Sequence, residues 1–518
     1  MRLTVAGVLL IAISSAALAG CTRTNAHSLS SLPRGEYTRV QLNLAARPTG
    51  KINKNLIGVS GLGPPSSSRA MRAIGVHWVR ADVGFQDSVG GKEVYDCSTG
   101  AWNPAATDRT VASIWRYGGT PLLIVDYSPA CLTANGSHNA APDLGSDKAK
   151  WDALVTEMGT HEIARGVRYF EVWNEPDWVF FSGGLEEYLN LYSDTARVLE
   201  SAAKQAGVNI EIGGPALADV LDSQNSDWLS PFLDYATKND LPLDFLSWHS
   251  YANYPYTGPF NPGGQPLCFG RASGPGTNLC YYNPNLDPLT VVHELGQARA
   301  ELARYPILHP LFIVDEWNLD GEYDPREAQT FDAAYTAAVL NSAQAERLDG
   351  MCFFTVEDSA SNSAEDWGML TSDGKPKPVY DTFSYWHDLA PREIPVMVSS
   401  HPARSKHGGV EGADQGTVGA VASTAGDGTV TVLLDNFKPY DKAGNYGTHD
   451  PTPYDRMVVL DVAGLRGGSY SVSRKQVDGS HDGGLVWQAV EYAAGGSIRI
   501  DFTLSGEGVA FVTLHPEG

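Results

Sequence analysis

An apolar, strand-like run ends in the stretch Phe170-Glu171-Val172-Trp173-Asn174-Glu175-Pro176-Asp177, and a helical pattern follows it. A second run ends in the same way far downstream, in Leu311-Phe312-Ile313-Val314-Asp315-Glu316-Trp317-Asn318. Each stretch places a carboxylate at the end of a short strand, next to an Asn or a Trp. In a barrel of alternating strands and helices, the ends of such strands meet on one face. We therefore expect acidic side chains from distant parts of the chain to gather there.

Short apolar strands alternate with helical segments over residues 51–390, which we assign to one domain. The amphipathic runs include Leu185–Ala206 and Leu289–Tyr305. Eight β–α units over this length are typical of a single (β/α)8 TIM barrel. A doubly wound sheet is the alternative, but no GxGxxG motif follows the first strand. The expected strands are Leu56–Ser60, His77–Val83, Pro121–Asp126, Arg168–Trp173, Ile210–Gly213, Phe245–His249, Leu311–Asp315 and Met351–Val356.

The helical pattern stops after residue 390, and residues 391–518 predict an accessory all-β sandwich domain. Residues 37–50 precede the barrel, and their alternating stretch Tyr37–Leu44 is expected to add a strand to the sandwich. The simplest interpretation of this domain is a packing module without a ligand of its own. Between Gly- and Asp-rich turns we expect the strands Thr417–Val421, Thr429–Leu434, Met457–Val462, Tyr470–Arg474, Ser497–Phe502 and Val509–Leu514.

The N-terminus has the pattern of an export signal. Met1-Arg2 precedes a mostly apolar run from Val5 to Leu18, and the segment closes as Leu18-Ala19-Gly20-Cys21. Residues 1–20 resemble a bacterial lipoprotein signal, after which Cys21 would be lipidated and residues 21–36 would form a flexible tether. The alternative is an ordinary secretory peptide with an incidental Cys. We expect an exported protein of the cell envelope, lipid-anchored or secreted.

Export bears on the other five cysteines, because disulfides persist outside the cytoplasm. Cys352 lies in an apolar strand-like run and is expected to be a buried thiol. The other four cysteines allow three pairings. We favour Cys97–Cys131, which would join two neighbouring loops, and Cys268–Cys280, which would close one Gly- and Pro-rich loop.

The composition limits the classes of partner. The formal net charge of −23 argues against nucleic acid and against an anionic membrane surface, since both would repel the chain. Contact with a membrane is therefore expected only through the lipid at Cys21. No cluster of residues has the spacing of zinc ligands, and we expect neither a metal nor an organic cofactor.

Glu175 and Glu316 are the candidate catalytic residues. Glu175 follows the fourth strand and Glu316 ends the seventh, almost across the barrel, so the two side chains can converge over its axis. Glycoside hydrolysis needs two such carboxylates, one to protonate the leaving oxygen and one to attack the sugar. Pro176 restricts the backbone of Glu175 and helps to hold an irregular turn. Taken alone, Glu175 could instead be a surface acid that opens the following helix.

Other polar residues also stand at strand ends. Arg80 could donate to the nucleophile, or it could pair with Asp82 or Asp126 as a structural bridge. His249 and Tyr251 share one side of the sixth strand by its two-residue period and could hold the nucleophile and the sugar hydroxyls. The residues after the eighth strand that could line the pocket are Glu357, Asp358 and Trp367, of which Trp367 would be a stacking platform for a sugar or simply part of the core.

These motifs together resemble glycoside hydrolase family 39. The resemblance rests on the barrel, on Trp173–Asp177 and Asp315–Asn318, and on the closing run Trp367-Gly368-Met369-Leu370-Thr371 through Gly374-Lys375-Pro376-Lys377-Pro378 to Phe383. That family includes β-xylosidases, α-L-iduronidases and bacterial exopolysaccharide hydrolases. The resemblance covers about residues 37–515 and implies a TIM barrel flanked by a β-sandwich.

The resemblance also implies roles for individual residues. Glu175 matches the acid/base of the family and Glu316 its nucleophile, while Asn174 matches the Asn that binds the 2-hydroxyl. His249 and Tyr251 match the pair on the sixth strand. One position departs from the pattern: where the xylosidases tend to have a His two residues after the strand-two Arg, this chain has Asp82. That departure puts a xylosidase assignment in doubt and favours another glycan.

The sequence thus predicts a retaining glycoside hydrolase that acts on an oligo- or polysaccharide by double displacement. Two alternatives remain open. One is a glycan-binding or envelope-assembly lipoprotein without turnover, and the other is a transglycosylase, in which an acceptor sugar replaces water.

Overall fold

The computed structural model describes residues 37–218, 220, 228–251, 288–319, 325–359, 367–401, 418–437 and 455–518. The predictions that concern residues 1–36, including Cys21, lie outside these ranges, as does the predicted Cys268–Cys280 disulfide. No helix of the described residues is long and apolar enough to cross a bilayer.

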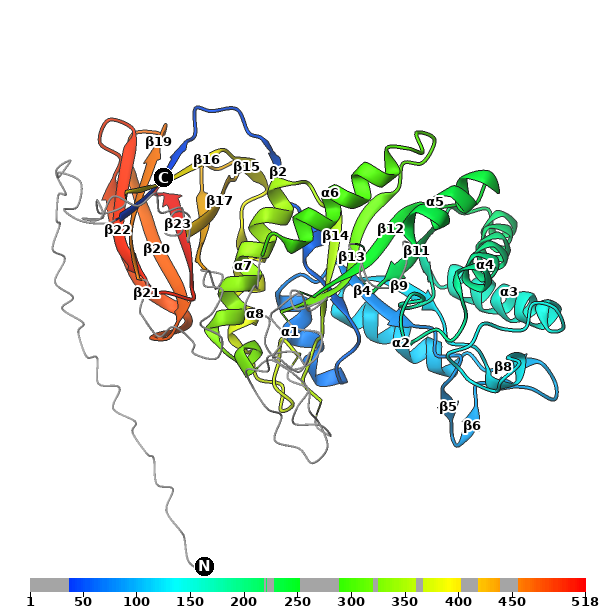
Figure 1. Cartoon of the computed structure of the whole chain (residues 1–518). Coiled ribbons are helices and arrows are strands. Elements are labelled where there is room, and N and C mark those ends of the chain that lie inside the picture. The colour runs from blue at the N-terminus through cyan, green and yellow to red at the C-terminus, as the bar shows by residue number, and fades with distance from the viewer. Residues whose placement is uncertain are drawn as a thin grey trace, which may run out of the picture. The chain divides into compact units, whose positions relative to one another are not determined.

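The core of the fold is a closed barrel of eight parallel strands, so the predicted fold class is confirmed (Figure 1). Each strand pairs in parallel with both of its neighbours, and β14 closes the barrel against β3. The strands follow the chain in order: β3 (Gly58–Ser60), β4 (Trp78–Asp82), β9 (Thr120–Val125), β10 (Tyr169–Val172), β11 (Glu211–Leu217), β12 (Phe245–Tyr251), β13 (Leu311–Asn318) and β14 (Gly350–Phe354).

Helices follow the strands along the chain and cover the outside of the barrel (Figure 1). They are α1 (Ser68–Ala73), α2 (Ala105–Tyr117), α3 (Lys148–Ala164), α4 (Leu185–Ala206), α5 (Leu229–Lys238), α6 (Thr290–Leu302), α7 (Thr330–Ala345) and α8 (Pro378–Asp388). Short 3-10 turns occupy Lys54–Leu56, Pro65–Ser67, Ala130–Leu132 and Pro325–Ala328. The loop after β4 also forms two small hairpins that the sequence pattern did not indicate: β5 (Ser88–Val89) with β6 (Lys92–Glu93), and β7 (Tyr95–Asp96) with β8 (Ala101–Trp102).

The inside of the barrel is apolar at its base and charged above it. Trp78, Leu122, Phe245, Ile313 and Cys352 pack together within the barrel. Because side chains alternate between the two faces of a strand, the residues two positions later also point inward. On β4, β10, β12 and β13 the buried polar side chains above this base are Arg80, Glu171, Ser247 and Asp315.

Two β-sheets form the remainder of the described chain. One has the order β16-β1-β19-β22 and the other the order β2-β15-β17-β18-β23-β20-β21. Their strands are β1 (Tyr37–Asn43), β2 (Gly50–Lys51), β15 (Arg392–Ile394), β16 (Val396–His401), β17 (Val418–Thr424), β18 (Val430–Asn436), β19 (Arg456–Ala463), β20 (Ser469–Asp478), β21 (His481–Tyr492), β22 (Ser497–Leu504) and β23 (Gly508–Pro516).

Strand β1 lies between β16 and β19 and so adds to the smaller sheet. The two sheets share one apolar core, which includes Val40, Val432, Leu460 and Val512. Strand β21 was not expected from the sequence. It is an edge strand whose side chains are mostly half-buried or exposed, so its apolar pattern is weak. Helix α8 contacts the larger sheet, because the ring of Tyr385 stacks on Phe511 with ring centroids 5.5 Å apart.

Candidate active site

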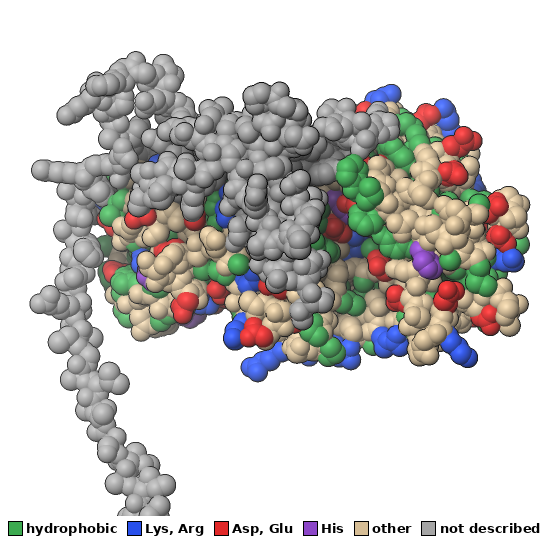
Figure 2. All heavy atoms as spheres, turned by 60° about the horizontal axis from the view of Figure 1, so that its bottom comes forward, with side chains coloured by type: hydrophobic (Ala, Val, Ile, Leu, Met, Phe, Trp, Pro, Cys, Tyr) green, Lys and Arg blue, Asp and Glu red, His purple; other side chains and the backbone are tan. Residues whose placement is uncertain are grey.

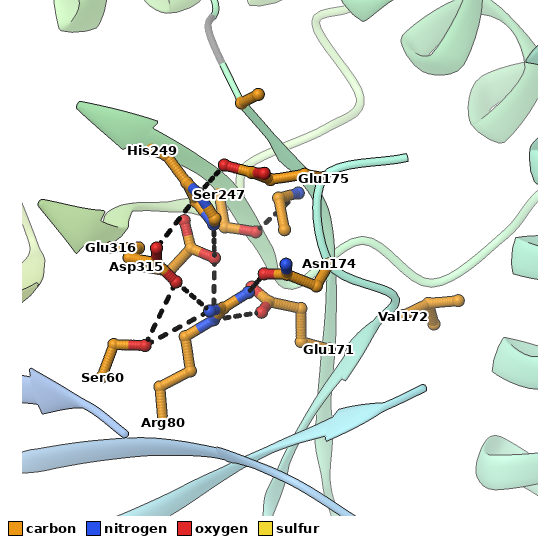
Figure 3. Close-up of polar contacts among 12 residues, drawn as sticks. Ser60, Arg80, Glu171, Val172, Asn174, Glu175, Ser247, His249, Asp315 and Glu316 are labelled. Carbon is orange, nitrogen blue, oxygen red and sulfur yellow. Dashed lines mark hydrogen bonds and ion pairs between the residues drawn. The ribbon is translucent and has the colours of Figure 1, made fainter. Parts of the chain in front are cut away.

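Arg80 is the centre of the polar layer in the barrel (Figure 3). Its Nε donates to Glu171 Oε2 at 2.6 Å and lies 3.0 Å from Asp315 Oδ2. Its Nη1 donates to Glu316 Oε2 at 3.0 Å, and its Nη2 donates to Asn174 Oδ1 at 2.8 Å. Burial opposes the charge, but the three carboxylates outweigh it and raise the pKa of Arg80. Arg80 is therefore a permanent cation that ties the ends of β4, β10 and β13 together, rather than a bridge to Asp82 or Asp126.

Glu171 and Asp315 form a buried acidic pair behind Arg80. Burial raises the pKa of Glu171 to about 8, and the neighbouring Asp315 adds to this, although Arg80 opposes it. The pKa of Asp315 is lowered: burial acts against this, but Arg80 and His249 both favour its ionised form. The two groups therefore titrate as a pair, in which burial favours a proton on Glu171 and the neighbouring cations favour a charge on Asp315. Sequence reasoning missed both residues, although the two-residue period of their strands places them inside the barrel.

A β-bulge brings Glu316 into the site beside Asp315. The pairing of β12 with β13 shifts between Trp248 and His249, so that Val314 and Glu316 have consecutive partners. Such a bulge lets two successive residues occupy one place in the ladder. The Glu316 carboxylate accepts a hydrogen bond from Tyr251 Oη at 2.6 Å on Oε1, and Arg80 donates to Oε2. Both oxygens are thus oriented by donors.

Glu175 lies in an irregular turn after β10. Trp173 has a φ of 72° and Glu175 a φ of 43°, a region that residues with a Cβ rarely adopt. The backbone N–H of Glu175 donates to Ala216 O at 3.0 Å. Trp173 Nε1 donates to Phe180 O at 3.1 Å. These contacts hold a strained backbone, which is common at functional sites.

His249 connects the two candidate catalytic residues. Its Nδ1 lies 2.7 Å from Glu175 Oε1 and 3.8 Å from Glu316 Oε1, while its Nε2 lies 3.6 Å from Asp315 Oδ2. Burial disfavours a charged imidazole, but Glu316, Asp315 and Glu175 together raise the pKa of His249 well above its usual range. The ring is therefore an imidazolium between carboxylates. A carboxylate oxygen of Glu175, a ring nitrogen of His249 and a carboxylate oxygen of Glu316 all lie within 4.8 Å of one another.

These residues stand at the floor of a cavity of about 680 Å³. Seven predicted site residues line it: Arg80, Asp82, Asn174, Glu175, Tyr251, Glu316 and Trp367. His249 lies beneath the wall, completely buried. In the space-filling view, acidic and histidine side chains are seen in the hollow at the centre of this face (Figure 2). The cavity wall also includes aromatic residues that sequence reasoning did not single out: Tyr127, Phe354, Trp178 and Phe180.

The cysteines of the described residues behave as predicted. Cys97 and Cys131 form a disulfide with their Cα atoms 6.1 Å apart, which confirms this pairing. Cys352 is a buried free thiol in the base of the barrel.

Known proteins have sequences similar to this chain. The sequence model of glycosyl hydrolases family 39 matches residues 66–261. A β-xylosidase from Geobacillus stearothermophilus is 25% identical over 313 residues, which cover 56% of this chain and 56% of that enzyme. The chain is related to glycoside hydrolase family 39. It spans only about half the length of this curated relative, and the matched family segment contains Arg80, Glu175 and His249 but ends before Glu316.

Solved structures show the same fold over nearly the whole chain. A glucosidase from Croceicoccus marinus has a TM-score of 0.69 and 20% identity, and the alignment covers 93% of this chain and 100% of that one. A monomeric β-xylosidase from Caulobacter crescentus CB15 has a TM-score of 0.66 and 17% identity, with 93% and 100% covered. At these identities the likeness establishes the fold.

Proposed function

We propose that this protein is a retaining glycoside hydrolase in which Glu175 is the acid/base and Glu316 the nucleophile. The observation that carries the proposal is their separation, because carboxylate atoms of the two residues lie within 4.8 Å of each other. Retaining enzymes hold their carboxyl groups about 5–5.5 Å apart, whereas inverting enzymes leave about 6.5–9.5 Å for a water molecule. The relation to family 39 supports the same mechanism.

In the first step, an oxygen of Glu316 attacks the anomeric carbon and the bond to the leaving oxygen breaks. Arg80 and Tyr251 donate to the Glu316 carboxylate and fix its direction. Glu175 and His249 share a proton across their 2.7 Å hydrogen bond, because the surrounding carboxylates raise the pKa of His249. Glu175 passes this proton to the leaving oxygen. The products of this step are a glycosyl ester on Glu316 and a free alcohol.

In the second step, the Glu175–His249 pair accepts a proton from water while the water oxygen attacks the anomeric carbon. The bond to Glu316 breaks and its carboxylate is regenerated. Arg80 stabilises that returning negative charge across 3.0 Å. Two inversions leave the sugar with its original configuration. Asn174 lines the cavity and is held by Arg80 at 2.8 Å, and we expect it to bind the sugar beside the anomeric carbon.

Mechanism-based labelling tests the assignment. A panel of activated 2-fluoro glycosides should inactivate the enzyme and leave the sugar on the peptide that contains Glu316. Removal of an acid/base typically slows a reaction by about 10²–10⁴-fold, so Glu175→Ala should lose activity on this scale, and azide should restore it as a glycosyl azide of retained configuration. A matched control is Glu211→Gln, since Glu211 begins β11 at the opposite end of the barrel. Silence across the panel would favour a binding protein.

The N-terminal pattern supports a second part of the proposal, that the enzyme is exported and lipid-anchored through Cys21. The support is the sequence Leu18-Ala19-Gly20-Cys21 after an apolar run. The variant Cys21→Ala, compared with wild type in a cell fractionation, should move from the membrane fraction to a soluble or uncleaved form. A wild-type protein whose mass shows no lipid on Cys21 would refute lipid attachment at this residue.

A further inference from the structure

The described wall of the cavity carries an excess of negative charge, of which Asp82 and Asp87 take no part in the proposed catalytic step. Among its described lining residues, the charged ones are Arg80, Asp82, Asp87, Glu175 and Glu316, which is one cation against four acids. The cation is already engaged, since Arg80 contacts Glu171, Asp315 and Glu316 within 3.0 Å. No positive charge on the described wall is left to pair with a negatively charged sugar.

A second acid stands directly behind Asp82. Strands β4 and β9 pair with Asp82 opposite Ile124, and Asp126 lies two residues beyond Ile124, on the same inward side. Asp126 is completely buried, and neither of its carboxylate oxygens has a hydrogen-bond partner among the described residues. Asp82 is exposed to the cavity. A buried carboxylate without a donor costs free energy, so burial favours the neutral form of Asp126, and the oxygens that can receive donors from a ligand are those of Asp82.

The electrostatics of the pair agree with its geometry. Burial raises the pKa of Asp126 well above its usual range, and the neighbouring Asp82 adds to this. Asp82 opens only to the cavity, and its partial removal from bulk water inside the barrel mouth raises its pKa to about 6; Arg80 opposes the shift, and Glu316 and Asp87 add to it. Close carboxyl groups resist a second negative charge, and a ligand carboxylate would bring a third.

We propose that Asp82, backed by Asp126, makes this cavity reject uronic acids, so that the cleaved sugar carries hydroxyl or ammonium groups and no carboxylate. This inference rests on the proposed function and decides between the anionic and non-anionic substrates of related enzymes. Asp82 accepts hydrogen bonds from the sugar. Asp126 is a positioning residue that acts through Asp82. Specificity of this kind is produced by repulsion of the wrong ligand as much as by attraction of the right one.

Matched pairs of aryl glycosides test the proposal, each pair differing only in a CH₂OH or a carboxylate at C5: glucose and glucuronic acid, galactose and galacturonic acid, mannose and mannuronic acid, idose and iduronic acid. Like charges placed together in a site cost several kcal/mol, so kcat/KM for the neutral member should exceed that for the acid by about 100-fold or more in each pair that is cleaved. The variant Asp82→Asn keeps the shape and removes the charge, and it should reduce this ratio by about 10-fold. Asp126→Asn replaces a carboxyl group that burial already favours in its neutral form with a neutral amide of the same shape, so it should change the ratio by less than about 2-fold.

A change in this ratio separates specificity from folding, because loss of folded enzyme lowers both rates equally. Asp152→Asn, on the surface of α3, removes the same charge far from the cavity and should leave the ratio unchanged. An acid cleaved as fast as its neutral partner would overturn the proposal.

Binding measurements test the rejection of uronic acids separately from the proposed hydrolase function. Titration of the free sugars can be followed by the fluorescence of the cavity residues Trp178 and Trp367. Neutral sugars that bind without turnover of any glycoside would refute the proposed function and leave this inference standing. Tighter binding of the acids, or no binding of any sugar in the panel, would overturn the inference.

Discussion

Replacing Tyr251 by Phe removes a single oxygen that touches the nucleophile. The hydroxyl donates to Glu316 Oε1 at 2.6 Å. Burial, and then the nearby carboxylates, raise the pKa of Tyr251 well above its usual range, so the group remains a donor throughout the working pH range. The carboxylate of Glu316 that accepts this hydrogen bond is charged in the free enzyme, and it becomes a neutral ester when Glu316 carries the sugar. Tyr251→Phe should therefore destabilise the free enzyme relative to the covalent intermediate.

The size of the effect follows from this hydrogen bond. Hydrogen bonds to charged groups contribute about 1.5–3 kcal/mol. If about half of that is recovered at the transition state of the second step, its barrier in the variant rises by about 0.8–1.5 kcal/mol. This corresponds to release of the sugar that is about 4- to 12-fold slower. The intermediate should then accumulate during turnover.

Stopped-flow measurement with an aryl glycoside that has a good leaving group detects this accumulation. The variant should release about one equivalent of phenolate in a burst, followed by a slow steady state. Tyr192→Phe is the matched control, because Tyr192 Oη donates to the carbonyl of Pro242 at 2.8 Å and does not contact Glu175 or Glu316. Steady-state rates within twofold of wild type and no burst in Tyr251→Phe would refute the assigned role of the hydroxyl.

Three further predictions concern charge. Arg80→Lys keeps the charge, but a lysine cannot contact Glu171, Glu316 and Asn174 at once, so kcat should fall by about 10- to 100-fold. The melting temperature is measured as a control for folding. Activity within twofold of wild type would contradict the role of these three hydrogen bonds. Burial raises the pKa of Asp435 to about 7 in the folded protein. The folded protein therefore favours the protonated carboxyl, and the free energy of unfolding is highest below the unfolded pKa of Asp435, which is about 4. As the pH rises from about 4 towards 7, the free energy of unfolding should fall by about 1.4 kcal/mol per pH unit, or about 4 kcal/mol in all. Asp435→Asn should therefore melt with wild type near pH 4 and above it at pH 8, and equal melting temperatures at pH 8 would contradict this. Because the closely spaced Glu175, His249 and Glu316 atoms already have protein partners, we expect a chelator such as EDTA to leave turnover unchanged, and restoration of lost activity by added metal would show the opposite.

The barrel could be predicted from the sequence because each strand is a short apolar run with its own boundaries. The limits of α4 agree with the predicted Leu185–Ala206 at both ends, since Gly207 adopts a left-handed φ of 69° that ends the helix. Strands β12 and β13 extend further than predicted, to Tyr251 and Asn318. The last residues of the two strands pair with each other, Ser250 with Trp317 and Tyr251 with Asn318. Because several of them are polar, the strand ends could not be predicted from the length of the apolar run.

The sequence by itself determined that Glu175 and Glu316 lie near the C-terminal ends of two strands of one barrel, because strand length and alternation are local properties. Which other groups meet them was decided only by closure of the barrel. A bulge turns Asp315 and Glu316 inward together. Arg80 contacts Glu171 rather than Asp82, although Asp82 is closer in sequence. These contacts join residues up to 236 positions apart, and hydrogen-bond geometry at that separation depends on strand register and tilt, which no local pattern encodes.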